Sequence, residues 1–212
     1  GTRVELSVLD SPLVALEGCS NVRLESMIFE NCRDMGIYEE DGGNLLIRNC
    51  EFRNLGTVAI DMGRGACRRW EEQEDQSEEN ILRSRIIGDI KGYMWHHPDA
   101  QRHPGKNIGI YGCLFHDLGC GGVILDGGDR KTVDYGRCYM ENCDIRHVNR
   151  IEKAYRGGVR FMGMGNLAFH NRFLYADHMT IDLMGNDNLI EYNEIGYSTT
   201  QCGDMGTIYH GV

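Results

Sequence analysis

Acidic, basic and imidazole side chains recur at fixed places in the second half of the chain. Four short segments end in glycine and alternate apolar with other residues; they span 123–127, 159–163, 181–185 and 207–211. Side chains alternate between the two faces of a β-strand, so we expect the apolar residues, Tyr209 among them, to point inward. The intervening residues would point outward, and the polar ones are Asp126, Arg160, Asp182 and His210.

A second set of polar residues precedes these strands. Aligned on the closing glycines, Arg156, His178 and Asp204 occupy the same position, and Asp204 is followed closely by Gly206. If the segments stack, the three side chains lie in one line. Carboxylates, histidine and arginine that converge in a cleft are typical of a functional site. Each residue also has a structural interpretation: Arg160 and Asp182 as a solvated cross-strand ion pair, His178 and Asp204 as turn residues.

These neighbours would influence one another. A carboxylate beside His178 should favour the charged form of the imidazole, and the imidazole should in turn keep Asp204 ionised.

A repeated phrase identifies the elements that would position these residues. It reads Asn21–Phe29, Asn44–Phe52 and Asn107–Phe115, and looser copies follow, aligned at Met27, Cys50, Cys113, Cys143, Arg172 and Asn193. Most copies are separated by roughly 20 to 30 residues, which indicates a stacked-repeat architecture. Each copy has an apolar residue, then the aligned residue three positions later, then another apolar residue.

Short alternating segments with 28 glycines and only 3 prolines favour strands joined by tight turns. The sequence therefore predicts an all-β fold, a right-handed parallel β-helix, as a single domain over residues 1–212. A long irregular insertion interrupts the repeat at about residues 64–106 and contains Trp95, which we expect to bind a sugar by stacking or to pack against the coils. The chain stops directly after a strand-like phrase, so we expect it to be a fragment that continues beyond Val212.

Composition excludes some partners. The net charge is −10, so we expect no nucleic acid partner, and no apolar stretch is long enough to cross a membrane. Nine cysteines are present, three of them (Cys50, Cys113 and Cys143) at the inward repeat position. We interpret those three as buried thiols, with a disulfide between coils as the alternative. Zinc-type spacing is absent, and we expect no metal or other cofactor.

Motifs in the second half of the chain resemble the β-helix proteins grouped around glycoside hydrolase family 141. The resemblance covers about residues 120–212 and rests on residues 127–132, 141–145, 163–166, 176–178, 185–195 and 204–211. It implies a secreted, periplasmic or cell-surface enzyme that cleaves a plant or algal polysaccharide. The chain departs from the family pattern at Thr200–Gly203, where members carry a glutamate, and at its end, where they carry Gly-Arg-Asp-Trp.

By this resemblance Asp204 is a catalytic carboxylate and His178 an acid–base or substrate-binding residue. Hydrolysis of a glycosidic bond needs two carboxyl groups, about 5–5.5 Å apart for retention and about 6.5–9.5 Å for inversion. Asp182 is a candidate for the second, but it is displaced by roughly 13 Å along an extended strand, so we favour a carboxylate beyond Val212. We expect the remaining candidates to bind the oligo- or polysaccharide: Arg156, Arg160, Asp126, His210, Tyr209 and Trp95. Two alternatives stay open. A polysaccharide lyase or epimerase would use Arg156 or Arg160, with calcium held by Asp126, Asp129 and Asp182. A non-catalytic glycan-binding solenoid would need none of this chemistry, and fold alone does not decide.

Overall fold

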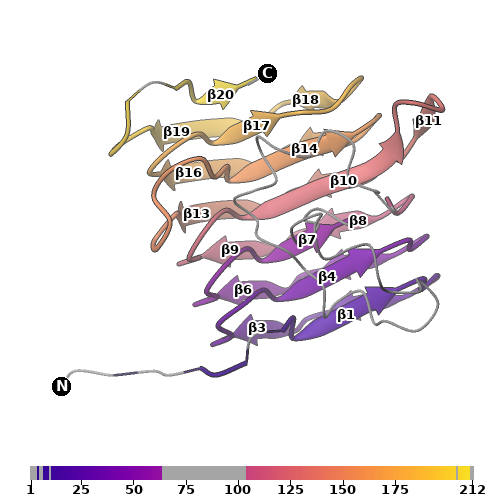
Figure 1. Cartoon of the computed structure of the whole chain (residues 1–212), viewed down its shortest axis with the longest axis horizontal. Helices are drawn as coiled ribbons and strands as arrows, with labels where there is room; N and C mark the ends of the chain where they lie inside the picture. The colour runs from indigo at the N-terminus through magenta and orange to yellow at the C-terminus, as the bar shows by residue number, and fades with distance from the viewer. Residues whose placement is uncertain (1–3, 5–6, 10, 64–103, 204, 211–212) are drawn as a thin grey trace, which may run out of the picture.

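The computed structural model describes residues 4, 7–9, 11–63, 104–203 and 205–210. Over these residues the chain forms short β-strands that stack into three parallel sheets, with N- and C-terminal coils at opposite ends of the stack (Figure 1). The described part contains no helix long and apolar enough to cross a membrane.

Every coil adds one strand to each sheet. Sheet 1 contains β1 (Val14–Glu17), β4 (Ile37–Glu40), β7 (Ile60–Met62), β10 (Val123–Asp129), β14 (Val159–Gly163), β17 (Ile181–Leu183) and β20 (Ile208–Tyr209). Sheet 2 contains β2 (Arg23–Glu25), β5 (Leu46–Arg48), β8 (Gly109–Tyr111), β12 (Tyr139–Glu141), β15 (Leu167–Phe169) and β18 (Leu189–Glu191). Sheet 3 contains β3 (Ile28–Glu30), β6 (Glu51–Arg53), β9 (Leu114–His116), β13 (Asp144–Val148), β16 (Arg172–Ala176) and β19 (Glu194–Ser198). The predicted parallel β-helix is confirmed.

One short strand departs from the parallel pattern. β11 (Asp134–Tyr135) pairs antiparallel with the end of β10, which projects beyond its neighbours in sheet 1 (Figure 1). The predicted insertion lies outside the described residues, except at its C-terminal end. There Gly105 and Lys106 already form bridges with Gly127 and Gly43, so the coil has resumed before Asn107.

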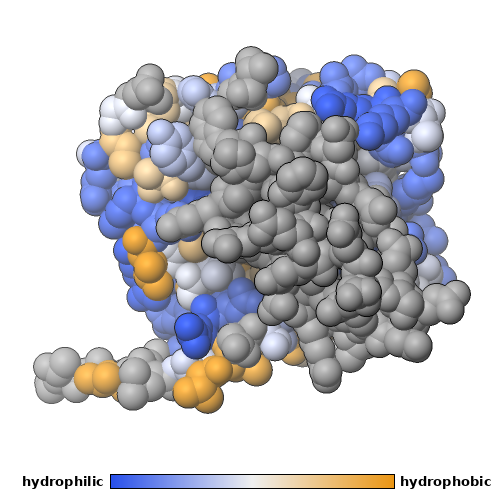
Figure 2. Space-filling view, in the orientation of Figure 1, coloured by the Kyte–Doolittle hydropathy of each residue, from blue (hydrophilic) through white to orange (hydrophobic). Residues whose placement is uncertain are grey.

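The core is a set of columns in which equivalent apolar side chains stack from coil to coil. Phe29, Phe52 and Phe115 stack with ring centroids 4.7 and 4.9 Å apart, close to the spacing of hydrogen-bonded strands. All three rings are buried. On the face in Figure 2 the described surface is mainly hydrophilic, with hydrophobic residues in small separate patches.

The asparagines that open the repeat phrase occupy left-handed turns. Asn21, Asn44 and Asn107 have φ angles of 59°, 54° and 54°, a region that asparagine tolerates better than most residues. Their amides bond from coil to coil: Asn44 Nδ2 donates to Asn21 Oδ1 at 3.5 Å, and Asn107 Nδ2 to Asn44 Oδ1 at 3.3 Å. The residue that begins the phrase is thus determined by the turn.

The inward position of the phrase forms a second ladder of thiols and amides. Cys50 N–H donates to Cys113 Sγ at 3.4 Å, and Cys113 N–H to Cys143 Sγ at 3.4 Å. Asn171 Oδ1 then accepts from Cys143 N–H at 2.9 Å, and Asn193 Oδ1 accepts from Asn171 N–H at 2.9 Å. Every cysteine in the described part of the chain is a free thiol, so the interpretation of these three as buried thiols is confirmed.

Two predicted registers are wrong by one residue. Strand pairing aligns Asp144 with Arg172, so Asn171, not Arg172, continues the inward ladder. In the last coil Ile208 pairs with Ile181 and Tyr209 with Asp182, so Tyr209 and not His210 follows the outward row. Both errors arose because the copies were aligned by sequence spacing alone. A neighbouring polar or glycine residue was then taken for the repeat position.

Replacement of Asn171 by alanine should destabilise the fold by about 3 kcal/mol, because Cys143 N–H and Met140 C=O lose buried partners. The matched control is Arg172→Ala, which removes only surface ion pairs and should cost less than about 1 kcal/mol. Denaturant unfolding measures both values. Equal losses for the two variants would contradict the assigned ladder.

Candidate functional site

The outer face of sheet 1 carries a row of buried polar side chains. Strand register aligns Tyr38, Asp61, Ile124, Arg160 and Asp182 on successive coils. Their neighbours Ile60 and Met62 point into the core, so by strand alternation this row points away from it. All five are nevertheless at most 4% exposed. Buried charge away from the core is the feature that singles out this face.

Three carboxyl groups of this face surround Gly63. When the register is continued, Glu40 and Asp126 are the residues aligned with Gly63 on either side of it, and Asp61 lies two positions before it. Strand spacing and rise place the Asp61 Cα about 8 Å from each of the other two. A Cβ on Gly63 would lie 2.9 Å from Asp126 Oδ2, so glycine is required there. We call Glu40, Asp61 and Asp126 the carboxylate cluster.

Asp61 is an acid held in its uncharged form. Burial raises its pKa to about 8, although the charge of Arg160 opposes the shift. Neither of its carboxyl oxygens has a hydrogen-bond partner. Tyr38 and Ile124, which flank Asp61 in the row, belong to an apolar group with Met35, Val58 and Cys120. This apolar surrounding is the physical cause of the shift, because it cannot solvate a carboxylate.

Glu40 is bonded on the same face. The hydroxyl of Tyr38 donates to Glu40 Oε2, and both side chains are buried. Burial is also the main reason why the pKa of Tyr38 lies far above its usual value, so this tyrosine stays a donor. The hydrogen bond fixes the Glu40 carboxyl beside the uncharged Asp61. Together they offer a proton donor and a carboxylate on adjacent strands.

A further acid, Glu39, lies inside the coil. It aligns with Leu16 and Met62 in an inward column, and burial raises its pKa to about 7. Its Oε1 accepts the Gly42 N–H at 2.6 Å. Glu39 thus binds the backbone at the corner after β4 and is not available on the outer face.

Arg160 and Asp182 form the ion pair that the sequence predicts, but the pair is not solvated. Arg160 Nε lies 2.6 Å from Asp182 Oδ2, and the two side chains are 4% and 0% exposed. Arg160 Nη2 also donates to the Tyr155 carbonyl at 3.4 Å. The pair engages one oxygen of Asp182, so this carboxylate is already occupied by a cation.

Arg156 and His178 are neighbours on adjacent coils, as predicted. Both are buried, and each lies three residues before a strand of the in-register pair β14 and β17. Arg156 Nη2 pairs with Glu152 Oε2 at 2.9 Å. The His178 ring packs against Tyr155 with centroids 5.3 Å apart, and burial lowers its pKa while Asp182 opposes the shift. Its Nδ1 has no hydrogen-bond partner, so a neutral imidazole is available there.

Other predicted site residues are not brought into this group. His210 is exposed at the last coil and its Nδ1 bonds the Leu183 carbonyl at 2.6 Å, so the prediction that it joins the outward row is wrong. Tyr209, which was predicted to point inward, takes that place beside Asp182. Asp204 and Trp95 lie outside the described residues.

The predicted calcium ligands do not converge. Asp126 is buried on the outer face, whereas Asp129 accepts the Lys131 N–H in an exposed turn at 2.8 Å. Asp182 lies two strands from Asp126 and is paired with Arg160. Within the described ranges no group of three or more His, Cys, Asp or Glu residues is placed to hold a metal ion.

Sequence reasoning missed Tyr38, Glu40 and Asp61. They lie in the first half of the chain, where the family resemblance is only generic. A usable signal was present, because Ile60-Asp61 and Ile181-Asp182 place an aspartate after the same inward isoleucine. Extending the outward row to the earlier coils would have found Asp61.

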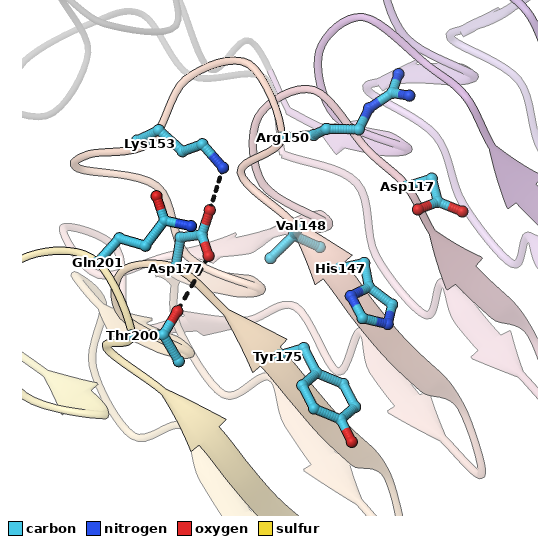
Figure 3. A pocket seen from close by; sticks show the side chains of 9 residues that line it. All are labelled: Asp117, His147, Val148, Arg150, Lys153, Tyr175, Asp177, Thr200 and Gln201. Carbon is cyan, nitrogen blue, oxygen red and sulfur yellow. Dashed lines mark hydrogen bonds and ion pairs between the residues drawn. The ribbon is translucent and has the colours of Figure 1, made fainter. Parts of the chain in front are cut away.

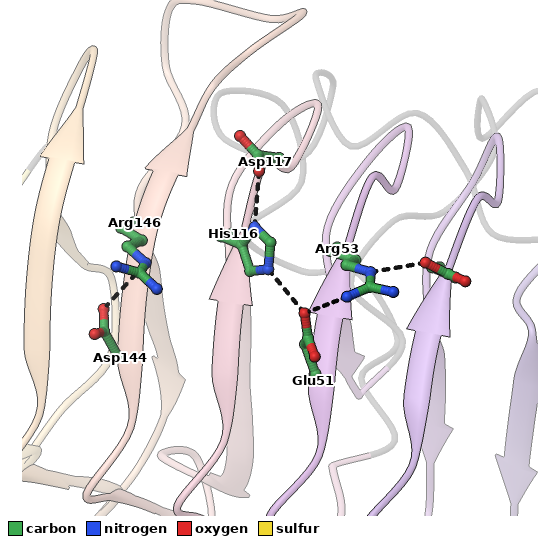
Figure 4. Close-up of polar contacts among 7 residues, drawn as sticks. Glu51, Arg53, His116, Asp117, Asp144 and Arg146 are labelled. Carbon is green, nitrogen blue, oxygen red and sulfur yellow. Dashed lines mark hydrogen bonds and ion pairs between the residues drawn. The ribbon is translucent and has the colours of Figure 1, made fainter. Parts of the chain in front are cut away.

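The outer face of sheet 3 carries charges of a different kind. Glu51 Oε1 contacts Arg53 Nη1 at 2.7 Å and His116 Nε2 at 3.0 Å, and His116 Nδ1 contacts Asp117 at 2.7 Å (Figure 4). These side chains are partly exposed, and pairs of this kind contribute little net free energy. We regard this face as a solvated surface that keeps coils in register.

Comparison with known proteins found neither a protein-family model that matches the chain nor a curated sequence that matches it significantly.

Replacement of Asp61 by asparagine should stabilise the protein more at pH 8 than at pH 5. The folded-state pKa of Asp61 is raised, so ionisation in the unfolded state makes wild-type stability fall as pH rises from about 4 to about 8. The variant lacks this loss, and its Tm relative to wild type should rise by on the order of 5 °C across the window.

Glu191→Gln, on the exposed edge strand β18, is the matched control, and its Tm relative to wild type should be the same at pH 5 and pH 8. Thermal unfolding at both pH values measures the Tm of wild type and of each variant. An Asp61→Asn difference that is flat with pH would show that Asp61 ionises normally.

Proposed function

We propose that this protein is a carbohydrate-active enzyme, a glycoside hydrolase that acts through the carboxylate cluster on the outer face of sheet 1. The observation that supports it is the uncharged Asp61 beside Glu40 on one face of a parallel β-helix. Glycosidic cleavage requires two carboxyl groups, one of which donates a proton. The resemblance to glycoside hydrolase family 141 adds the substrate class, a plant or algal polysaccharide, and a secreted, periplasmic or cell-surface location.

In this proposal Asp61 donates its proton to the glycosidic oxygen. Glu40, positioned by Tyr38, is the carboxylate that attacks the anomeric carbon or activates water. Asp126, which packs over Gly63, would bind sugar hydroxyls, and the row through Arg160, Asp182 and Tyr209 would extend the binding face. Because the cluster is buried, the substrate reaches it only when this face is open to solvent.

Asp204 stays a second proposed catalytic carboxylate, based on the family resemblance alone. His178 and Arg156, which precede adjacent strands of sheet 1, would contact substrate beside the cluster. The pair Asp61 and Glu40 differs from the Asp204 pair in needing no residue beyond Val212. Asp61→Asn and Asp204→Asn variants therefore test the two proposals separately.

Digestion of a library of plant and algal glycans should release reducing ends with the wild-type protein. Asp61→Asn and Glu40→Gln should each lower kcat/KM by about 10²- to 10⁴-fold, the usual contribution of acid–base catalysis. Glu141→Gln in sheet 2 is the matched control and should retain activity, because it is a half-buried glutamate on a different face. Full activity of both cluster variants would refute the assigned roles.

A polysaccharide lyase is the second candidate, favoured by one observation. His178 is a buried imidazole with a lowered pKa and an unbonded Nδ1, and Arg156 and Arg160 lie on the adjacent coil. A neutral base beside arginines suits proton abstraction next to a uronate carboxylate.

The products decide between the candidates. A lyase would form unsaturated, ultraviolet-absorbing sugars from a polyuronate, and His178→Ala would lower that rate by about 10²-fold or more while Asp61→Asn would not. Reducing ends without ultraviolet absorption would exclude the lyase. Binding of glycans without any cleavage would favour a non-catalytic glycan-binding solenoid.

A further inference from the structure

A separate pocket lies at the turns that leave sheet 3, on the coils of β9, β13, β16 and β19. Its volume is about 320 Å³, and its walls include His147, Arg150, Tyr175 and Gln201 (Figure 3). None of its lining residues belongs to the carboxylate cluster. We call it the turn pocket.

Both carboxylates of the turn pocket already have polar partners. Asp177 forms an ion pair with Lys153 and accepts the Thr200 hydroxyl at 3.1 Å (Figure 3). Asp117 contacts His116 Nδ1 at 2.7 Å. Arg150, by contrast, is exposed, and its guanidinium makes no hydrogen bond or ion pair with the described chain. The uncompensated group in the pocket is therefore a cation with several N–H donors.

An aromatic stack forms one wall. His147 and Tyr175 stack with centroids 4.7 Å apart, and Tyr175 and Tyr197 with centroids 4.8 Å apart. Strand register places Asn31, Asn54 and Asp117 at the same position on earlier coils. At this turn of the described coils, aromatic residues thus replace asparagine and aspartate from His147 onward.

The backbone at these aromatic positions is left-handed. The φ angles of His147, Tyr175 and Tyr197 are 53°, 58° and 52°, a conformation that bulky side chains rarely adopt. Left-handed residues recur at turns throughout the described coils, His170 and Tyr192 among them, so this conformation belongs to the repeat and only the aromatic side chains are particular to this turn. One face of His147 packs on Tyr175; the next coil on the other side carries Asp117, and no described ring stacks on that face. It offers a flat surface against which the apolar face of a sugar ring can pack.

We infer that the turn pocket binds a negatively charged sugar unit, through the carboxylate of a uronic acid or a sulfate ester. Arg150 pairs with the anion in the bidentate geometry that guanidinium favours, His147 packs on the ring, and Gln201 bonds hydroxyl groups. With a net charge of −10 the whole protein repels anions, so such binding depends on this local group. The inference rests on the proposed function and adds the substrate class, an acidic polysaccharide.

Titration calorimetry tests the inference with three oligosaccharides of equal length: an oligogalacturonate, a neutral galactan fragment and a sulfated galactan fragment. Wild-type protein should bind one or both acidic ligands at least tenfold more tightly than the neutral one, and the preferred ligand distinguishes carboxylate from sulfate. Arg150→Ala should remove this preference and Arg150→Lys should retain part of it. Arg130→Ala, at an exposed arginine in the turn after β10, should change nothing.

Equal binding of neutral and acidic ligands, or an unchanged preference in Arg150→Ala, would overturn the inference. Failure of the proposed function is distinguishable, because Asp61→Asn should bind the acidic ligand as tightly as wild type. Cleavage that is insensitive to Asp61→Asn would refute the catalytic cluster and leave the turn pocket standing. If Arg150→Ala loses binding of the acidic ligand but the protein still cleaves neutral glycans, the carboxylate cluster works without the turn pocket.

Discussion

The structure depends on backbone hydrogen bonding between successive coils in one fixed register. Each strand pairs in parallel with the equivalent strand of the next coil, so equivalent residues lie one strand spacing apart. A change of register by one residue would move every side chain of a strand to its other face. The thiol and amide ladder from Cys50 to Asn193 satisfies backbone N–H groups where the coil turns between sheets. Because the register is fixed, residues with the same structural role form columns along the stack.

The same constraint concentrates charge where solvent cannot compensate it. Outward positions of sheet 1 place Asp61, Arg160 and Asp182 in one buried row. The two aspartates of this row are accommodated in different ways. Asp182 is compensated by Arg160, while Asp61 lies between Tyr38 and Ile124 and keeps its proton. Sheet 3 places comparable charges in partly exposed pairs, which contribute little net free energy. Burial therefore distinguishes the two faces more than composition does.

Much of the fold could be predicted from periodicity, since alternation and repeat spacing report directly on strands and coils. Asp126, Arg160 and Asp182 were correctly placed on one outward face for that reason. The predictions for Arg172, Tyr209 and His210 were wrong because spacing alone does not reveal where a turn gains or loses a residue. Extending the outward row to the earlier coils would have found Asp61, but the burial of Asp61, Tyr38 and Glu40 has no signal in the sequence. Glu39 shows the same difficulty, as it lies in a column otherwise apolar.

The sequence by itself determined the architecture, because short alternating segments that recur at intervals of roughly 20 to 30 residues predict stacked parallel strands. It also determined which residue types are available for chemistry. Only the tertiary structure decided which carboxyl groups meet, because Glu40, Asp61 and Asp126 come from three strands and are adjacent only through pairing between coils. It alone decided the acidity of Asp61, since a raised pKa depends on the apolar side chains that other coils place around it.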